Sequence, residues 1–237
     1  MDADFYDKRT FSLSTRQPPS IISDADIRKL TWPLPIPETD IFQEFWQFSH
    51  ITVSFIGRVF IAGCLLAFGM INYQILVIVA GMLFLPMLPL LLGISFGSWT
   101  REWRLVLQSL SAFVIAIVLL VIAGAAVAVF SSPPLKFTEF NSLVVSVLLS
   151  LAVGVAAVLA NVDDIGKREL IGLAATSQIA VIPVWFGICF VFGFPAILSG
   201  QEIMMRALTF LINILVILIV SFGAYGVMRE THAVKDK

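Results

Sequence analysis

Long apolar stretches without a charged residue alternate along this chain with short polar segments. Charges are absent from five windows, which cover residues 59–100, 105–135, 140–162, 170–201 and 207–228. A helix needs about 20 apolar residues to cross a hydrocarbon layer of roughly 30 Å, so four of these windows hold one span each. The first window is long enough for two, separated by Asn72-Tyr73-Gln74. The pattern predicts six transmembrane helices, at residues 52–71, 75–97, 105–130, 142–161, 169–192 and 205–228.

Two of the apolar runs carry nearly the same eight-residue phrase. Segment 89–96 reads PLLLGISF and segment 183–190 reads PVWFGICF, and Arg104 with Ser111 is echoed by Arg206 with Asn213 at the same interval. We therefore expect two three-helix repeats, 51–130 and 142–228, joined by an outer loop at 131–141. Because three is odd, the second repeat is inverted relative to the first. The fold class is all-α, a polytopic membrane protein whose second helix in each repeat is broken at proline.

The segments that flank the repeats have a different composition. Residues 1–38 are polar and rich in proline, which favours a disordered cytoplasmic tail. Residues 39–50 place Ile41, Phe42, Phe45 and Trp46 on one helical face. This pattern is typical of an amphipathic helix in the headgroup layer, and a helix packed against the bundle is the alternative. Residues 229–237 are expected to form a second cytoplasmic tail.

The positions of Lys and Arg predict the orientation. Thirteen of them fall on the side of the two tails, and only Lys136 and Arg206 fall on the other. The loops on the basic side contribute Arg101, Arg104, Lys167 and Arg168. Basic residues collect on the cytoplasmic side of bilayers, so we expect a multi-pass protein of the cell (inner) membrane with both termini cytoplasmic.

The candidate pathway residues are prolines and polar side chains inside the spans. Proline removes one helical hydrogen bond, so Pro86, Pro89 and Pro183 would leave the carbonyls of Met82, Leu85 and Ile179 without donors. Backbone freed in this way marks ion and solute sites in repeat transporters, although a plain kink is the alternative. Polar side chains at membrane depth should face the interior, and they are Ser111, Thr176, Gln178 and Asn213. They would form a neutral site for a cation or a polar solute, or merely join helices.

Small residues recur every four positions on two predicted spans. They are Ser142, Ser146, Ser150 and Gly154 on the fourth span, and Gly172, Thr176 and Ala180 on the fifth. Small residues at this spacing let helix backbones approach closely, so we interpret them as packing surfaces. The stripe on the fourth span also suits self-association, and we expect a homo-oligomer in the lipid bilayer.

The sequence lacks residues that several classes of functional protein require. No ionisable side chain lies in the middle of a span, whereas proton-driven carriers use such groups as relays. The chain shows no nucleophile–base pair, no phosphate-binding glycine loop and no metal-ligand spacing. We expect no enzyme activity, no cofactor, no metal and no nucleic-acid partner.

Residues 55–228 resemble the bacterial uncharacterised hydrophobic domain family, known as domain of unknown function 389. The resemblance rests on the segments 82–86 (MLFLP), 97–99 (GSW), 103–105 (WRL), 170–174 (LIGLA), 181–183 (VIP) and 210–213 (FLIN). Pro86 and Pro89 lie three residues apart, where the family usually has four. The resemblance implies an integral membrane protein without a settled activity.

Two functions remain open at this stage. The first is a small secondary transporter or channel for an ion or polar solute at the junction of the repeats. The alternative is a non-transporting membrane scaffold or sensor whose cytoplasmic tail binds a partner. A polar pocket where Gln178 and Asn213 meet favours transport, and dry packing there favours a scaffold.

Overall fold

The computed structural model describes residues 38–132, 140, 142–162, 168–195 and 200–235, so all of the predicted tail 1–38 except its last residue, and most of the outer loop, lie outside it. Within those ranges all regular structure is helical. The helices are α2 (Glu38–Phe48), α3 (Val53–Asn72), α4 (Ile75–Leu83), α5 (Met87–Thr100), α6 (Trp103–Val129), α7 (Leu143–Val162), α8 (Arg168–Ile179), α9 (Val181–Phe192) and α10 (Gly200–Lys235).

The long apolar helices agree closely with the predicted spans. Five helical segments are long and apolar enough to cross a bilayer, at Val53–Asn72, Trp103–Val129, Leu143–Ala160, Ile171–Phe192 and Gly200–Val227, and α4 with α5 forms a sixth if that bent pair counts as one span. The length and composition of these helices are compatible with a polytopic membrane protein. The last helix departs from prediction, because α10 begins at Gly200 and continues through Lys235, where a separate tail was expected.

The short connections are closed by backbone hydrogen bonds. Tyr73 after α3 and Arg101 after α5 both adopt left-handed backbone angles, with φ of 56° and 62°. In each case the following amide reaches back to a glycine carbonyl, Gln74 to Gly69 and Glu102 to Gly97, both at 2.8 Å. Such a cap satisfies carbonyls that the helix end would otherwise leave without donors. The Asn72-Tyr73-Gln74 turn is therefore where the polar break predicted it.

Helix α2 packs against the bundle. Its Ile41 and Phe45 are buried, and the Phe45 ring meets Phe96 of α5 edge-on with centroids 5.7 Å apart. The contacts of α2 are with α5 and α6. The amphipathic face was expected either to lie in the headgroup layer or to pack against the bundle. For Ile41 and Phe45 the structure supports packing against the bundle.

Helices α4 and α5 are separated by a bend. Helix α4 ends at Leu83, α5 begins at Met87, and their axes differ by 40°. Pro86 occupies the position just before α5. The Met82 carbonyl accepts a bond from the Leu85 amide at 3.3 Å, so the expectation that Pro86 leaves this carbonyl without a donor is wrong. The turn itself supplies a new donor.

The other two prolines lie near helix starts. Pro89 is the third residue of α5 and Pro183 the third residue of α9. The first amides of a helix have no intrahelical acceptor, so proline loses no hydrogen bond there. Helix α9 follows α8 after Ala180 alone, and the stretch Ile171–Phe192 counts as one span.

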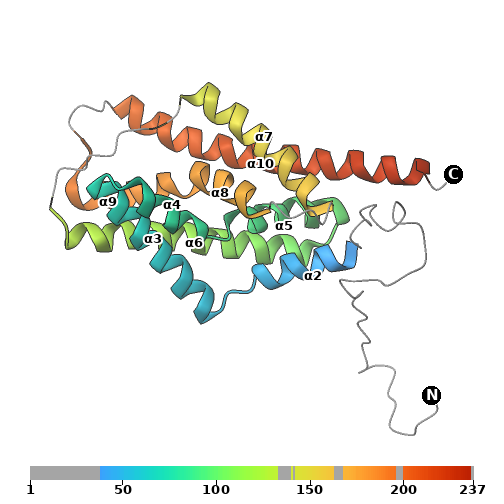
Figure 1. Ribbon diagram of the computed structural model, residues 1–237, viewed down its shortest axis with the longest axis horizontal. Coiled ribbons are helices and arrows are strands. Elements are labelled where there is room, and N and C mark those ends of the chain that lie inside the picture. Colours follow the sequence, from blue (N-terminus) through green and yellow to red (C-terminus); the bar gives the residue numbers. More distant parts are fainter. Residues whose placement is uncertain (1–37, 133–139, 141, 163–167, 196–199, 236–237) are drawn as a thin grey trace, which may run out of the picture. The chain divides into compact units, whose positions relative to one another are not determined.

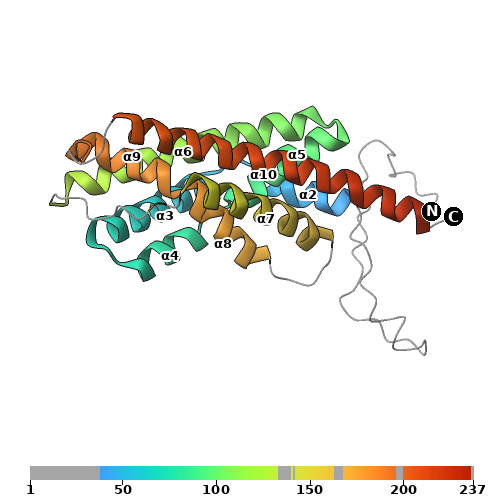
Figure 2. The same cartoon turned by 90° about the horizontal axis from the view of Figure 1, so that it is seen from above.

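The span formed by α8 and α9 is the most enclosed of the five. In an apolar 18-residue window of this span 72% of the residues are buried, against 11% in the corresponding window of α10. Helix α6 packs on α3, α5 and α9, while α10 packs on α7 and α5, and α8 contacts both α4 and α5. In both views α4 and α5 run toward the end of the bundle where α10 finishes, and α8 and α9 run the opposite way (Figures 1 and 2).

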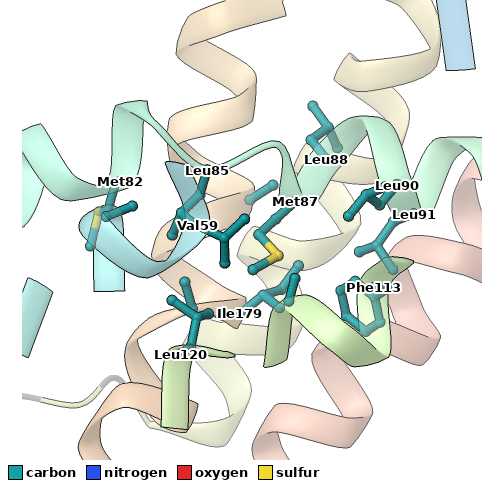
Figure 3. Packing of buried hydrophobic residues seen from close by; sticks show 14 of the residues in the cluster. Val59, Met82, Leu85, Met87, Leu88, Leu90, Leu91, Phe113, Leu120 and Ile179 are labelled. Carbon is teal, nitrogen blue, oxygen red and sulfur yellow. The ribbon is translucent and has the colours of Figure 1, made fainter. Parts of the chain in front are cut away.

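The apolar core fills the space around the α4–α5 bend. Figure 3 shows Leu85 before the bend and Met87 after it, with Ile179 of α8 and Leu120 of α6 on the opposite side. Met87, Ile179 and Leu120 are fully buried. Close packing of this kind holds the bend in one geometry, because large side chains would have to separate before it could change.

Candidate functional site

The centre of the candidate site is a pair of buried amides. The Asn213 side-chain Nδ2 of α10 donates to Oε1 of Gln178 of α8 at 3.2 Å. Asn213 is 1% exposed and Gln178 is 6% exposed. The Asn213 Oδ1 atom is buried and has no hydrogen-bond partner. Two of the four polar side chains that the sequence placed at membrane depth are thus brought together, and the Asn213 Oδ1 acceptor is left without a donor.

The amide pair faces a cavity of about 210 Å³, which we name the inner cavity. Its walls come from α4, α7, α8, α9, α10 and the segment before α7. The lining residues are Met82, Phe140, Ser146, Ser177, Gln178, Val181, Ile182, Arg206, Thr209 and Asn213. Six of these ten are polar or charged, so the cavity could hold water or a polar solute. Gln178 and Asn213 thus meet on the wall of this cavity.

Arg206 is the functional candidate that sequence reasoning missed. It lies in the first turns of α10 and lines the inner cavity together with Asn213. Its guanidinium carbon lies 4.0 Å from the ring centroid of Phe140 and 4.7 Å from that of Trp185. The neutral site expected from the sequence therefore carries a positive charge at one side. In the sequence, Arg206 stands out only because it occupies the position that matches Arg104 in the first repeat, and that match indicated only the start of a helix.

A second cavity of about 560 Å³ lies beside the α4–α5 bend, and we name it the bend cavity. Pro86, Pro89 and Leu85 line it on one side, and Gly172 of α8 and Arg58 of α3 are among the residues opposite. Met82 lines both this cavity and the inner cavity. One apolar side chain at the end of α4 therefore forms part of the wall of two cavities, a relation that nothing in the sequence indicated.

Three predicted pathway residues line neither cavity. Ser111 is exposed on α6 and donates to the Gln108 carbonyl of its own helix at 2.8 Å. Thr176 is buried, but its hydroxyl donates to the Gly172 carbonyl at 2.7 Å. Pro183 lines neither of the two cavities. Ser111 points outward because its helix meets α3, α5 and α9 through other faces, which the echo with Asn213 could not show.

The small residues on α7 pack within the chain. Ser146, Ser150 and Gly154 are buried, and the carbonyl of Gly154 accepts from Ser221 of α10 at 3.4 Å. Ser142, one turn earlier, is exposed. This stripe serves the contact with α10, which leaves little of it for self-association. A homo-oligomer stays a prediction.

The two small residues predicted to pack on α8 differ from each other. Ala180 is fully buried at the junction with α9. A side chain added at Gly172 would meet nothing within 4 Å, so this glycine does not allow a close helix contact and instead borders the bend cavity.

The topology residues are only partly described. Arg101 and Arg104 are exposed at the turn between α5 and α6. Arg168 is the first residue of α8, and Lys167 lies outside the described residues. Among the described side chains no group of three or more His, Cys, Asp and Glu gathers at metal-binding distance.

Comparisons with protein-family models, with curated proteins and with solved structures found no match to this chain. The resemblance to the uncharacterised hydrophobic domain family therefore stays a prediction.

Replacing both members of the amide pair should destabilise the protein by less than the sum of the two single replacements. Asn213→Leu leaves the Gln178 amide buried without its partner, which costs about 1–3 kcal/mol. In Gln178→Leu/Asn213→Leu neither polar group remains, so the double variant should lose less than the sum of the single losses. Interhelical bonds in membrane proteins couple by about 0.6 kcal/mol on average. Melting temperatures of the four purified proteins test this, and strictly additive losses would argue against the bond.

Proposed function

We propose that this chain is a multi-pass protein of the cell (inner) membrane that passes a small ion or polar solute between the inner cavity and the bend cavity. The observation that carries the proposal is the buried Gln178–Asn213 pair on the wall of a polar cavity. A second observation gives the route, because Met82 borders both cavities. In this arrangement Met82 is the constriction between them. Membership of the uncharacterised hydrophobic domain family forms part of the same proposal.

The helix pairings support an inverted repeat around this route. Helix α3 packs on α6 in the first half as α7 packs on α10 in the second, and α6 lies against α9 as α10 lies against α5. Two halves in opposite orientation would produce matching pairs of this kind. Transporters built from inverted repeats place their solute sites where interrupted helices meet at the repeat interface. Both termini would be cytoplasmic, with Arg101 and Arg104 on that side.

The chemistry at Met82 suits a gate. Methionine is unbranched and flexible, so it can block a passage in one rotamer and leave it in another. Met82 lies one residue before the end of α4, next to the 40° bend. Rotation of the Met82 side chain would therefore open the passage while the packed bend keeps its geometry.

A first test measures whether water reaches the inner cavity. Ser146 and Ser150 are buried one turn apart on α7, but only Ser146 lines the cavity. In a background with Cys64→Ala and Cys189→Ala, we expect Ser146→Cys to react with a membrane-impermeant, water-soluble thiol reagent at least tenfold faster than Ser150→Cys. The substitution replaces oxygen by sulfur in both variants, so the comparison isolates access. Mass spectrometry of the intact protein gives the rates.

Equal, slow labelling of the two cysteines would contradict a water-filled cavity. It would favour the alternative function, a membrane scaffold with dry packing at its centre. Fast labelling of both would indicate a locally open bundle. The proposed route requires fast labelling of Ser146→Cys alone.

A further inference from the structure

Arg206 places a positive charge on the wall of the inner cavity. Among the described residues that line this cavity it is the one charged side chain. Its contacts with Phe140 and Trp185 are with the faces of aromatic rings. Ring faces attract a cation but accept no conventional hydrogen bond, so the N–H donors of the guanidinium still need acceptors. One of its terminal nitrogens, Nη1, is buried and has no hydrogen-bond partner.

No acidic side chain is among the described residues that line the inner cavity. Glu202 lies one helical turn earlier on α10 and acts electrostatically on Arg206, but its side chain is exposed and is not among the lining residues. Nη1 is therefore a buried donor, and Glu202, its electrostatic partner among the described residues, does not line the cavity. A buried donor without a partner costs about 1–3 kcal/mol, and a bound anion would remove that cost.

The other polar groups on the wall constrain the ligand further. The hydroxyls of Ser177 and Thr209 donate to carbonyls of their own helices, those of Ala174 and Met205, both at 2.7 Å. Toward the cavity these two oxygens can only accept, as can the unpartnered Asn213 Oδ1. Asn213 lies two turns along α10 from Arg206, about 10.5 Å by helical rise, and the long arginine side chain spans part of that interval. The unpartnered groups on the wall are thus a donor on Arg206 and an acceptor on Asn213, two turns further along α10.

From this polarity we infer that the inner cavity binds a small carboxylate that also carries a hydroxyl or amino donor. The carboxylate would meet the Arg206 guanidinium, whose fork matches its two oxygens. The donor group would meet Asn213 Oδ1. A cavity of about 210 Å³ holds roughly seven waters at about 30 Å³ each, which admits a solute the size of lactate. The inference rests on the proposed function only where it identifies this ligand as the transported solute; the binding site itself does not depend on transport.

The test uses the full chain purified in detergent and titrated calorimetrically with three probes at constant ionic strength. Sodium lactate carries both the charge and the donor, sodium acetate carries the charge alone, and lactamide carries the hydroxyl without the charge. We expect saturable binding of lactate, weaker binding of acetate and none of lactamide. Arg206→Gln should weaken lactate binding at least tenfold, because a charge-assisted hydrogen bond is lost. Arg206→Lys should lie between the two.

Arg104→Gln is the matched control. Arg104 holds the echoed position at the start of α6, is exposed, and lines neither cavity. Its loss removes the same charge from the protein, so binding should stay at the wild-type level. Size-exclusion elution at the wild-type volume establishes that each variant is folded.

Three outcomes would overturn the carboxylate site: undiminished lactate binding by folded Arg206→Gln, equal binding of lactamide and lactate, or no saturable binding of either carboxylate by the wild type. Failure of the proposed transport function can be distinguished from failure of the carboxylate site. Lactate binding that depends on Arg206, without lactate flux into proteoliposomes, would reject the proposed function and keep the site. Flux of a neutral solute such as glycerol without lactate binding would keep the transporter and reject its assigned ligand.

Discussion

Gly187→Ala is expected to lower the free energy of unfolding by about 3 kcal/mol, at the upper end of the cost of overpacking a core. A Cβ built at Gly187 of α9 meets the backbone carbonyl of Val121 in α6, and one built at Gly124 of α6 meets the carbonyl of Val184 in α9. The obstructing atoms are main-chain atoms of a helix, which cannot rotate aside as a side chain can. The two helices would have to separate along their whole contact.

The measurement is thermal unfolding of the purified protein in detergent, followed by tryptophan fluorescence. A loss of that size lowers the melting temperature by roughly 6–12 °C in a chain of this length. Gly57→Ala in α3 is the control, because a Cβ there meets nothing within 4 Å. Alanine favours a helix over glycine by up to about 1 kcal/mol, so this control should be neutral or slightly stabilising. Equal melting temperatures for both variants would contradict the close α6–α9 contact.

Met82→Ala is expected to raise passive solute flux at least tenfold. The substitution removes most of the side chain that borders both cavities and so joins them into one path. The width of the passage at its constriction limits flux far more than the width of the cavities on either side does. Only at the constriction must the solute lose its surrounding water. The measurement is lactate efflux and glycerol entry in proteoliposomes, each compared with protein-free vesicles.

Met70→Ala is the matched control for this experiment. Met70 is fully buried on α3 and lines neither cavity, so its truncation leaves a void in the core. Truncations of this kind cost about 2–5 kcal/mol of stability and should leave flux unchanged. Unaltered flux of both probes through folded Met82→Ala would remove Met82 as the constriction. Raised flux in both variants would show that destabilisation alone causes leak.

The positions of the helices follow closely from local sequence. Whether a proline breaks a helix or lies in its first turn does not. Apolar length and polar breaks such as Asn72-Tyr73-Gln74 act within one segment, so span boundaries could be predicted to within a few residues. The exception is α10, which continues through Lys235. A proline by itself only removes one backbone N–H donor. Its surroundings decide whether it breaks a helix or starts one, and Pro89 and Pro183 both lie in first turns.

The sequence alone determined an all-helical chain with apolar spans and small, polar residues where helices would meet. It also identified Gln178 and Asn213 as side chains that must be satisfied inside, because an amide at membrane depth is costly without a partner. Only the tertiary structure decided that these two bond to each other, that Arg206 joins their cavity while Ser111 faces outward, and that Met82 borders both cavities. These relations depend on which faces of helices distant in the chain pack together. Helical periodicity defines the faces of one helix, but the partner that covers each face is selected by packing of the whole bundle.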